Sequence, residues 1–410
     1  MQEKRQKPIW ASADNELLIV RGPLMIPYGK QDITDGDIKA VIDVLTSPHL
    51  TQGPAVPKFE QDVIRHCNAK YAVAVNSATS ALHVACLAME LGAGDWLWTT
   101  PNTFVASANC ALYCGAKVDF VDIDPRTYNM CPVALEEKLV NAERQGRLPK
   151  VVVPVHFSGQ PCDMRVIHAL SEKYGFGIIE DASHAIGGLY LNEPIGNCRY
   201  SDITVFSFHP VKIITSAEGG MAVTNNEKYA EKMALLRSHG ITRTPSLMTK
   251  PMEGSWYYQQ VDLGFNYRMT DLQAALGGSQ MSRLSHYVAR RHEIAKRYNR
   301  LLADLPVITP WQSKDGHSAY HLYVIRLKLD EIGRSHGEVF EALRAKEIMV
   351  NLHYIPVHTQ PYYQNMGFKL GDYPEAERYY AEAISIPLFP ALKEVEQDYV
   401  VASLTELLQQ

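Results

Sequence analysis

The stretch VFSFHPVKIITSAEGG, residues 205–220, leads to the fold and the chemistry of this chain. An apolar run typical of a buried strand reaches Ser207, a single lysine follows at Lys212, and two glycines close the segment. Lysine is rarely buried without a partner, yet Lys212 stands among valine and isoleucine residues. A desolvated lysine has a lowered pKa and becomes a nucleophile toward carbonyl groups. The stretch therefore indicates either a solvated surface charge or an amine presented at the end of a strand.

Other strand-like runs surround this one and alternate with helix-length amphipathic segments. The expected strands are YAVAV at 71–75, KVDFVDID at 117–124, KVVVPVHF at 150–157, FGIIEDAS at 176–183 and ITVFSF at 203–208. Helices are expected between them, for example in PVALEEKLVNAERQG and MRVIHALSEKYG. Apolar strands that alternate with helices predict an α/β fold with a largely parallel sheet covered on both faces. Ligands of such sheets bind at the carboxyl ends of the strands.

The pattern changes after about residue 275. A long charged helix is expected over 282–305, and a last helix from about Val395 to Leu408, with mixed strands and helices between them. This arrangement indicates a second, smaller α+β domain, because the chain exceeds the usual length of one domain. We predict an N-terminal extension at 1–24, a large domain at 25–280 and a small C-terminal domain at 281–410.

Charge and cysteine content exclude several classes of function. The formal net charge of −5 gives no electrostatic footprint for nucleic acid or an anionic membrane. The seven cysteines are scattered and lack a CxxC pair, so reduced thiols in the cytosol are expected, with Cys110 and Cys114 in the core. The uncharged stretch 96–116 contains Pro101 and Asn102, which disfavour a membrane helix. We expect a cytoplasmic protein with neither a nucleic acid nor a membrane as partner.

Three further segments place reactive or polar side chains where strands end. IIEDASHAIG, 178–187, ends its strand at Asp181, which is also a favourable helix N-cap. In VNSATSALH, 75–83, a strand leads through small hydroxyl residues into a helix, which suits a phosphate group and equally a helix cap. TTPNTFVASAN, 99–109, presents Phe104, whose ring can stack on a flat ligand or fill the core.

One ligand requires all of these features together with Lys212. The aldehyde of pyridoxal phosphate needs a lysine for a Schiff base, and its pyridinium nitrogen needs a carboxylate to stay protonated. Its phosphate needs backbone N–H groups and hydroxyls, and its ring a flat apolar neighbour. We therefore predict pyridoxal phosphate as the cofactor.

From about Ile26 to its end the chain resembles the DegT/DnrJ-type nucleotide-sugar aminotransferases, which depend on pyridoxal phosphate. The motifs that carry the resemblance are LTQGP at 50–54, NSATSALH at 76–83, EDASHAIG at 180–187, FSFHPVKIITSAEGG at 206–220, GFNYRMTDLQAAL at 264–276 and NLHYIPVHTQPYY at 351–363. Within that family it is most similar to the UDP-4-amino-4,6-dideoxy-N-acetyl-β-L-altrosamine transaminases of pseudaminic acid biosynthesis. The resemblance implies fold type I, which is aspartate aminotransferase-like: a large domain with a mostly parallel mixed sheet and a smaller α+β C-terminal domain.

The resemblance also implies roles for single residues. Lys212 would form the Schiff base, Asp181 would pair with the pyridinium nitrogen, and His184 would lie near the ring oxygen or the ring face. Phe104 would stack on the ring. Phosphate contacts are implied at Ala78, Thr79 and Ser207, and at Asn266 from a partner subunit, which makes the protein a homodimer with shared sites. Substrate contacts are implied at Tyr28, His49, Leu50, Thr51, Asn351, His353 and Tyr354.

The resemblance implies transfer of an amino group from glutamate to C4 of a UDP-linked 4-keto-6-deoxy-N-acetyl sugar. An alternative is a sister transaminase acting on another UDP-, GDP- or dTDP-linked keto sugar. Relatives that dehydrate the sugar replace the lysine by histidine, and this chain keeps Lys212. A non-catalytic regulator would need a DNA-binding segment or a lost lysine, and the sequence has neither. The spacing of His353 and His358 fits no zinc motif, so no metal is predicted.

Overall fold

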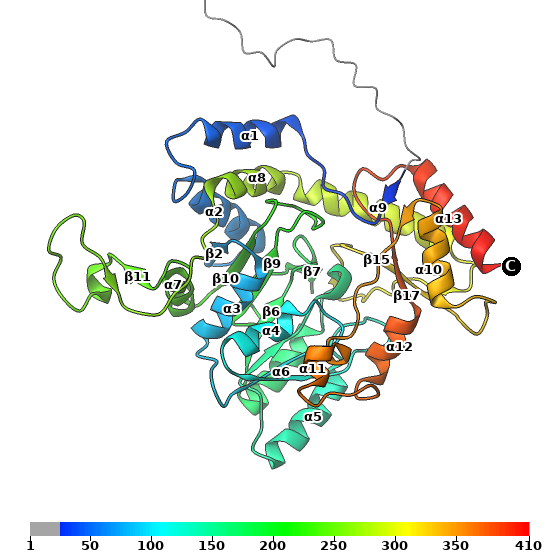
Figure 1. The fold of residues 1–410 in the computed structure, drawn as a ribbon, viewed down its shortest axis with the longest axis horizontal. Coiled ribbons are helices and arrows are strands. Elements are labelled where there is room, and N and C mark those ends of the chain that lie inside the picture. Colours follow the sequence, from blue (N-terminus) through cyan, green and yellow to red (C-terminus); the bar gives the residue numbers. More distant parts are fainter. Residues whose placement is uncertain (1–24, 410) are drawn as a thin grey trace, which may run out of the picture.

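The computed structural model describes residues 25–409, so the extension predicted at 1–24 lies outside the described residues (Figure 1). Within them the helices are α1 Asp35–Leu45, α2 Ala55–Cys67, α3 Ala78–Ala88, α4 Ala106–Tyr113, α5 Pro132–Arg144, α6 Met164–Tyr174, α7 Glu227–Leu236, α8 Asp271–Met281, α9 Leu284–Leu301, α10 His336–Ala345, α11 Pro361–Gln364, α12 Pro374–Glu382 and α13 Glu394–Leu408. None of these helices is long and apolar enough to cross a membrane.

A seven-stranded sheet forms the centre of the molecule (Figure 1). Its strands, in spatial order, are β2 Tyr71–Val75, β10 Gly220–Thr224, β9 Ile203–Ser207, β6 Gly177–Asp181, β5 Val151–Val153, β3 Trp96–Thr99 and β4 Lys117–Phe120. Only β10 runs against the others in this sheet, pairing antiparallel with β2 and β9. This mostly parallel mixed sheet confirms the predicted fold class, and each of the five expected strands is present, four of them shorter than predicted.

Helices cover both faces of this sheet because alternate residues of a strand point to opposite faces. In β6, Ile179 packs in the same core as residues of α3 and α4, whereas Ile178 packs with residues of α5 and α6. In β9, Val205 faces α3 and α4, and Phe206 packs in the core that includes α2 and α8. Both side-chain sets are buried, so the strands read as continuous apolar runs rather than alternating ones.

The C-terminal part of the chain has a core of its own. Helices α9, α10 and α13 pack on an antiparallel sheet formed by β13 Val307–Ile308, β15 Tyr323–Leu327 and β17 Ala383–Ile386. Figure 1 shows α10, α12 and α13 gathered on one side of the molecule, with α9 leading to them from α8. The predicted long helix and last helix correspond to α9 and α13. The domain boundary at residue 280 stays a prediction, and it falls just before the end of α8.

Short strands complete the fold. β1 Ile26–Pro27 pairs with β16 Ile348–Met349, which joins the start of the described chain to its C-terminal part. β7 Leu189–Tyr190 pairs with β8 Glu193–Pro194 and with β14 Gly316–His317. β11 Ile241–Thr242 and β12 Gln259–Gln260 form a hairpin that projects from the molecule beside α7 (Figure 1).

Candidate active site

A cavity of about 540 Å³ lies where β6 and β9 end and α3 begins. This is the carboxyl edge of the large sheet, where the fold predicts a ligand. Most of the residues assigned from the sequence line the cavity: Tyr28, Ala78, Thr79, Phe104, Asp181, His184, Ser207, Lys212, Asn351, His353 and Tyr354.

The register of two parallel strands places Asp181 and Ser207 side by side. Asp181 of β6 pairs with Val205 of β9, two residues before Ser207. Because side chains alternate along a strand, both residues share the face of Ile179, which is covered by α3 and α4. Glu180, the other acid of this motif, lies on the opposite face. The sequence contains two adjacent carboxylates, and the alternation selects one of them for the cavity.

The Asp181 carboxylate is held in place by hydroxyl groups. Ser107 donates to one oxygen (Oγ to Oδ2, 2.6 Å), and Ser183 donates to the other from its hydroxyl (2.6 Å) and its backbone N–H (3.1 Å). The Thr103 hydroxyl contacts that of Ser107 at 2.8 Å. No helix begins after Asp181, so the helix-cap interpretation of this residue is wrong. The three hydroxyl residues were not assigned from the sequence, although Thr103 and Ser107 have the spacing of one helical turn.

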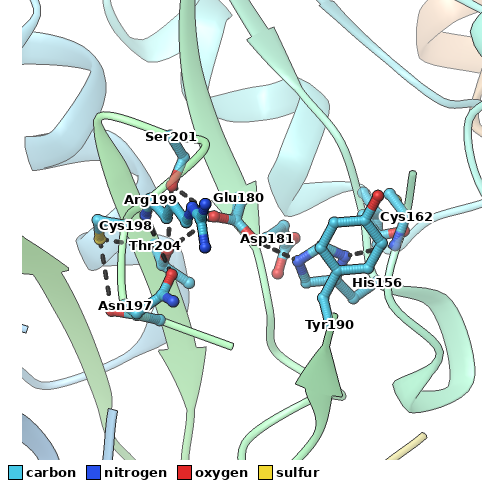
Figure 2. A network of polar contacts seen from close by, with 12 residues as sticks. His156, Cys162, Glu180, Asp181, Tyr190, Asn197, Cys198, Arg199, Ser201 and Thr204 are labelled. Carbon is cyan, nitrogen blue, oxygen red and sulfur yellow. Dashed lines mark hydrogen bonds and ion pairs between the residues drawn. The ribbon is translucent and has the colours of Figure 1, made fainter. Parts of the chain in front are cut away.

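Glu180 belongs to a separate buried network (Figure 2). Its carboxylate contacts the His156 ring at 2.6 Å and accepts hydrogen bonds from Ser201 and from Thr204, the latter at 3.2 Å. His156 is fixed in turn by the backbone N–H of Cys162, which donates to Nδ1 at 3.0 Å. Both carboxylate oxygens of Glu180 are therefore engaged away from the cavity, and its network ties β6 to β9 on the other face of the sheet.

Lys212 lies in the loop between β9 and β10, at the edge of the cavity. Its backbone N–H donates to the His209 carbonyl at 2.9 Å, which closes a turn and fixes the backbone that carries the side chain. Among the described residues no hydrogen bond or ion pair ends on its Nζ. Burial lowers the pKa of the Lys212 amine from 10.5 to about 8, although the Asp181 carboxylate opposes this shift. About a tenth of the amine is thus unprotonated at pH 7, far more than for an ordinary lysine. Lys212 lines the cavity and is not exposed, which argues against the surface-charge interpretation.

The first turn of α3 forms the polar end of the cavity. Ser77 caps the helix, because its Oγ accepts from the backbone N–H of Ser80 at 3.1 Å. The N–H groups of Ala78 and Thr79 have no partner within the helix and lie at its positive end. A Cβ on Gly220 would lie 2.5 Å from the Ala78 nitrogen, so only glycine lets β10 come this close. The capping and phosphate interpretations are therefore compatible: Ser77 caps, and the next two residues face the cavity.

Aromatic rings flank the cavity. Phe104 is 58 % exposed, so the interpretation that it fills the core is wrong. His184 is buried, accepts at Nδ1 from the Ser158 backbone N–H (3.2 Å) and contacts the Tyr354 hydroxyl through Nε2 (3.1 Å). Burial, with the nearby Lys212 charge, holds the pKa of His184 well below its usual value. Its imidazole is therefore neutral and carries its proton on Nε2, from where it donates to Tyr354.

The substrate residues predicted on the C-terminal side gather around Tyr28. The Tyr28 ring lies 5.2 Å from the ring of His353, and the Asn351 amide contacts His353 Nε2 at 3.5 Å. His353 Nδ1 contacts the Ser385 hydroxyl at 2.9 Å. His358 instead contacts Glu377 at 2.8 Å, and no cluster of three metal-binding side chains occurs within residues 25–409.

Four of the predicted residues do not line this cavity: His49, Leu50, Thr51 and Asn266. Asn266 is exposed, and its backbone carbonyl accepts from the Asn76 amide at 3.4 Å. The Leu50 carbonyl accepts from the Asp271 backbone N–H at 3.0 Å. Asn266 was expected to act on a partner subunit, so its place outside the cavity of its own chain leaves that prediction open. The roles of the other three also stay predictions.

His321 lines the cavity and was not assigned from the sequence. It belongs to the segment that leads into β15, in the C-terminal part of the chain. Its neighbours in sequence, Tyr320 and Leu322, are apolar or aromatic and typical of a strand, so no local pattern marks it. Only the packing of the C-terminal part against the large sheet brings it to the cavity.

The residues around the cavity fit pyridoxal phosphate. Lys212 offers an amine with a lowered pKa, and Asp181 offers a carboxylate fixed by three hydrogen bonds. The start of α3 and Ser207 offer donors suited to a phosphate, next to the glycine that admits close backbone contact. Phe104 offers an exposed ring at the same cavity.

Comparison with known proteins identifies relatives over nearly the whole chain. A sequence model of the DegT/DnrJ/EryC1/StrS aminotransferase family matches residues 31–405. The spore coat polysaccharide biosynthesis protein SpsC of Bacillus subtilis is 39% identical over 386 residues, which cover 93% of this chain and 97% of that protein.

Solved structures agree with this. PseC of Helicobacter pylori, described as an aminotransferase involved in the biosynthesis of pseudoaminic acid, has a TM-score of 0.85 and 31% identity, covering 94% of this chain and 99% of that one. A sugar aminotransferase designated Spr1654, from Streptococcus pneumoniae, has a TM-score of 0.83 in its PLP form at 28% identity, covering 93% and 98% of the two chains. Its PMP form is similar as well, with a TM-score of 0.84.

Proposed function

Because the chain belongs to the DegT/DnrJ/EryC1/StrS aminotransferase family, we propose that it transfers an amino group from glutamate to C4 of a UDP-linked 4-keto-6-deoxy-N-acetylhexosamine. The product would be UDP-4-amino-4,6-dideoxy-N-acetyl-β-L-altrosamine, an intermediate of pseudaminic acid biosynthesis. The similarity to PseC, which is named for that pathway, supports this choice of sugar. The similarity to SpsC, which is named for polysaccharide synthesis, supports the wider class of sugar substrates.

The family and its PLP- and PMP-form structures establish pyridoxal phosphate as the cofactor, as predicted from the sequence. When bound, the cofactor supplies an aldehyde that carries the amino group between the two substrates and a ring that accepts electrons. Residues of the chain bind and orient the cofactor and the substrates and transfer the proton, and we propose a role for each of them.

Lys212 is the residue that binds the cofactor aldehyde and moves the proton. With the cofactor bound, the Lys212 amine would lie next to the reacting carbon and would act as the base that moves its proton. The observation that best supports the proposed function is the lowered pKa of the Lys212 amine, about 8, in a cavity that Asp181 also lines. An amine of ordinary pKa would be almost fully protonated at neutral pH and could neither attack a carbonyl nor accept a proton.

The other residues orient and hold the cofactor. Asp181 would face the ring nitrogen, since its carboxylate is fixed at the end of β6 by Ser107 and Ser183. Ser207 and the first turn of α3 would bind the phosphate. His184, neutral and hydrogen bonded to Tyr354, would lie against the ring.

The proposal includes a homodimer in which Asn266 of each protomer reaches the phosphate of the other site. The exposure of Asn266, and its absence from the cavity of its own chain, are compatible with that role. His49, Leu50 and Thr51 are proposed to contact the nucleotide sugar.

The decisive experiment offers the purified protein glutamate together with a panel of UDP-, GDP- and dTDP-linked keto sugars. We expect amination of the UDP-linked 4-keto-6-deoxy-N-acetyl sugar, with the amine at C4 and the altro configuration, as determined by NMR of the product. Amination of only a GDP- or dTDP-linked sugar would replace the proposed substrate by that of a sister enzyme.

The Lys212→Ala variant is the control. It should lose transamination with every sugar in the panel and lose the visible absorbance of lysine-bound cofactor. Full transamination by this variant would overturn the assignment of Lys212.

A further inference from the structure

Two histidines at the cavity, His209 and His321, have no role in the proposed function, and of these His209 is exposed whereas His321 is buried. Its side chain is only 4% exposed, yet it lines the cavity. Its Nδ1 atom is buried and has no hydrogen-bond partner among the described residues. Nε2 also has no hydrogen-bond partner within residues 25–409. Unlike Nδ1, it is not among the fully buried atoms, so it is the ring nitrogen that faces the cavity. A buried polar ring with one nitrogen directed into a ligand cavity lacks the partner that such groups normally have.

The backbone that carries His321 is fixed from two sides. Arg291 of α9 is fully buried and donates from Nη1 to the carbonyls of Tyr320, His321 and Leu388, at 3.1, 3.1 and 3.0 Å. On the other side Gly159 packs so closely that a Cβ there would lie 2.8 Å from the Tyr320 nitrogen and 3.1 Å from that of His321. The position of the ring is therefore imposed by the surrounding structure.

The residue before His321 has an unfavourable backbone conformation. Tyr320 has a φ of 48°, in the left-handed region that bulky residues rarely adopt. Such conformations are energetically unfavourable and persist where the surroundings over-determine them, often at ligand sites. Here the Arg291 hydrogen bonds and the contact with Gly159 supply that constraint.

The surroundings also decide where the proton of the ring lies. Burial, together with the charges of Lys212 and Arg291 and the nearby His184 and His353 rings, holds the pKa of His321 well below its usual value, so the ring is neutral. A neutral imidazole carries one proton, and a buried N–H without an acceptor is less tolerable than a buried lone pair. The proton therefore belongs on Nε2, on the cavity side. The ring packs against His184, with centroids 4.4 Å apart, which fixes its plane.

We propose that His321 is a substrate-contacting residue whose Nε2–H donates a hydrogen bond to an oxygen of the substrate. The acceptor is a carboxylate oxygen of the amino donor or an oxygen of the keto sugar. Both substrates enter the cavity in the proposed function, on which this inference rests. Arg291 and Gly159 act as positioning residues for His321.

Two substitutions separate this hydrogen bond from simple packing. In His321→Gln the side-chain amide can place an N–H near the position of Nε2, whereas in His321→Asn the shorter amide reaches only the position of Nδ1. His317→Asn is the matched control, because His317 is exposed and stacks on His292 at 4.0 Å outside the cavity. Near-native thermal unfolding of each variant would establish that the fold is retained.

The measurement has two arms, one for each source of the acceptor. The first follows the half-reaction with glutamate alone, by the absorbance of the bound cofactor; the second follows the keto sugar that the wild type aminates. Dissociation constants for glutamate and for that sugar, measured by calorimetry in a Lys212→Ala background that blocks turnover, give a readout other than activity. Failure of the wild type with every sugar would contradict the proposed function, while the glutamate arm would still test His321.

We expect His321→Asn to weaken binding in one of the arms by about tenfold to a hundredfold, the range for a lost hydrogen bond in a buried site. His321→Gln should recover a large part of that loss, and His317→Asn should match the wild type. Unchanged binding in both arms for His321→Asn would overturn the proposal. Equal losses for the Asn and Gln variants would also overturn it, because they would indicate a packing role for the ring.

Discussion

At the scale of single residues, the immediate surroundings of Lys212 and Asp181 decide what each side chain can do chemically. The Lys212 amine is desolvated and has no hydrogen-bond partner among residues 25–409, so its charged form is disfavoured. Asp181 lines the same cavity, and its carboxylate accepts three hydrogen bonds, from Ser107 and Ser183. The two residues thus differ in environment although both line the same cavity: the amine of Lys212 is available as a nucleophile and a base, and the carboxylate of Asp181 as a hydrogen-bond acceptor.

The lowered pKa of Lys212 predicts how cofactor binding depends on pH. The unprotonated amine is the nucleophile, so the rate at which the cofactor-free protein binds pyridoxal phosphate should rise about tenfold per pH unit below the pKa and level off above about 8. Stopped-flow absorbance at a series of pH values measures this rate. A rate that still rises steeply above about pH 9 would mean that Lys212 titrates like an exposed lysine.

The Asp181→Asn variant provides the control for this pH profile. The Asp181 carboxylate favours the charged form of Lys212, so its removal should lower the pKa of the amine further. The plateau of the binding rate should then begin at a lower pH than in the wild type. A shift toward higher pH would contradict the electrostatic coupling of the two residues.

The neighbouring acids Asp181 and Glu180 predict opposite effects when each is neutralised. Asp181→Asn should lower kcat by about a hundredfold or more and leave the free energy of unfolding nearly unchanged, because the amide no longer holds a charge at the ring nitrogen. Glu180→Gln should leave kcat nearly unchanged and lower stability by about 3 kcal/mol, because it breaks the buried pair with His156. Steady-state kinetics and urea unfolding separate the two; an equal loss of kcat in both variants would argue against the assignment.

At the scale of secondary-structure elements, strand alternation and strand register arrange the site. The pairing of β6 with β9 puts Asp181 and Ser207 on one face, and a slip by one residue would present Glu180 instead. Next to β9 the antiparallel strand β10 places Gly220 opposite Ser207 and opposite Val75, directly beside the first turn of α3. The polar end of the cavity is thus a junction of three strands and one helix.

This junction makes Gly220 sensitive to any side chain. A Cβ there would lie 2.4 to 2.5 Å from backbone atoms of Ser77 and Ala78, so Gly220→Ala must push β10 and the start of α3 apart. We expect a loss of stability of about 1–3 kcal/mol and weaker binding of pyridoxal phosphate, measured by urea unfolding and by cofactor titration.

Gly337→Ala is the matched control for that substitution. Gly337 lies in α10, and a Cβ on it would meet no atom within 4 Å. Alanine is the better helix former, so this variant should be as stable as the wild type or up to about 1 kcal/mol more stable, with unchanged cofactor affinity. Equal behaviour of the two variants would show that the close contact at Gly220 is unimportant.

At the scale of the whole molecule, the cavity requires both parts of the chain. Asp181 at the end of β6 and Lys212 in the loop between β9 and β10 lie on one side, whereas His321, His353 and Tyr354 come from the C-terminal part. Arg291 of α9 donates to carbonyls from two separate segments of that part and so holds the segment of His321 in place within it.

The proposed homodimer with shared sites predicts complementation between two inactive variants. If Asn266 acts on the partner's cofactor, a mixed dimer of Lys212→Ala and Asn266→Ala protomers contains one site with both native residues and one with neither. Random mixing of the two variants, after reversible dissociation, should then restore about a quarter of wild-type activity. A mixture as inactive as its components would mean that Asn266 acts within its own chain or has no role at the phosphate.

The sequence alone was sufficient to predict the family, the cofactor and the reactive residues that lie where strands end. Asp181, Ser207 and Lys212 each follow an apolar run, and strand ends of a parallel sheet meet at one edge, so their convergence is a property of the pattern. The NSATS turn could be interpreted in two ways: the structure confirms the cap at Ser77, whereas the phosphate interpretation stays a prediction that is compatible with Ala78 and Thr79 facing the cavity.

What only the tertiary structure decided was how each side chain is surrounded. The sequence left Asp181 as a possible helix cap and Phe104 as a possible core residue; the turn after β6 and the open cavity excluded both. It gave no sign of Ser107 as the partner of Asp181, or of His321 at the cavity, because those contacts join residues 74 and more positions apart. A local pattern specifies the element that carries a residue, but desolvation and hydrogen bonding depend on neighbours brought from elsewhere in the chain, and these decide its chemistry.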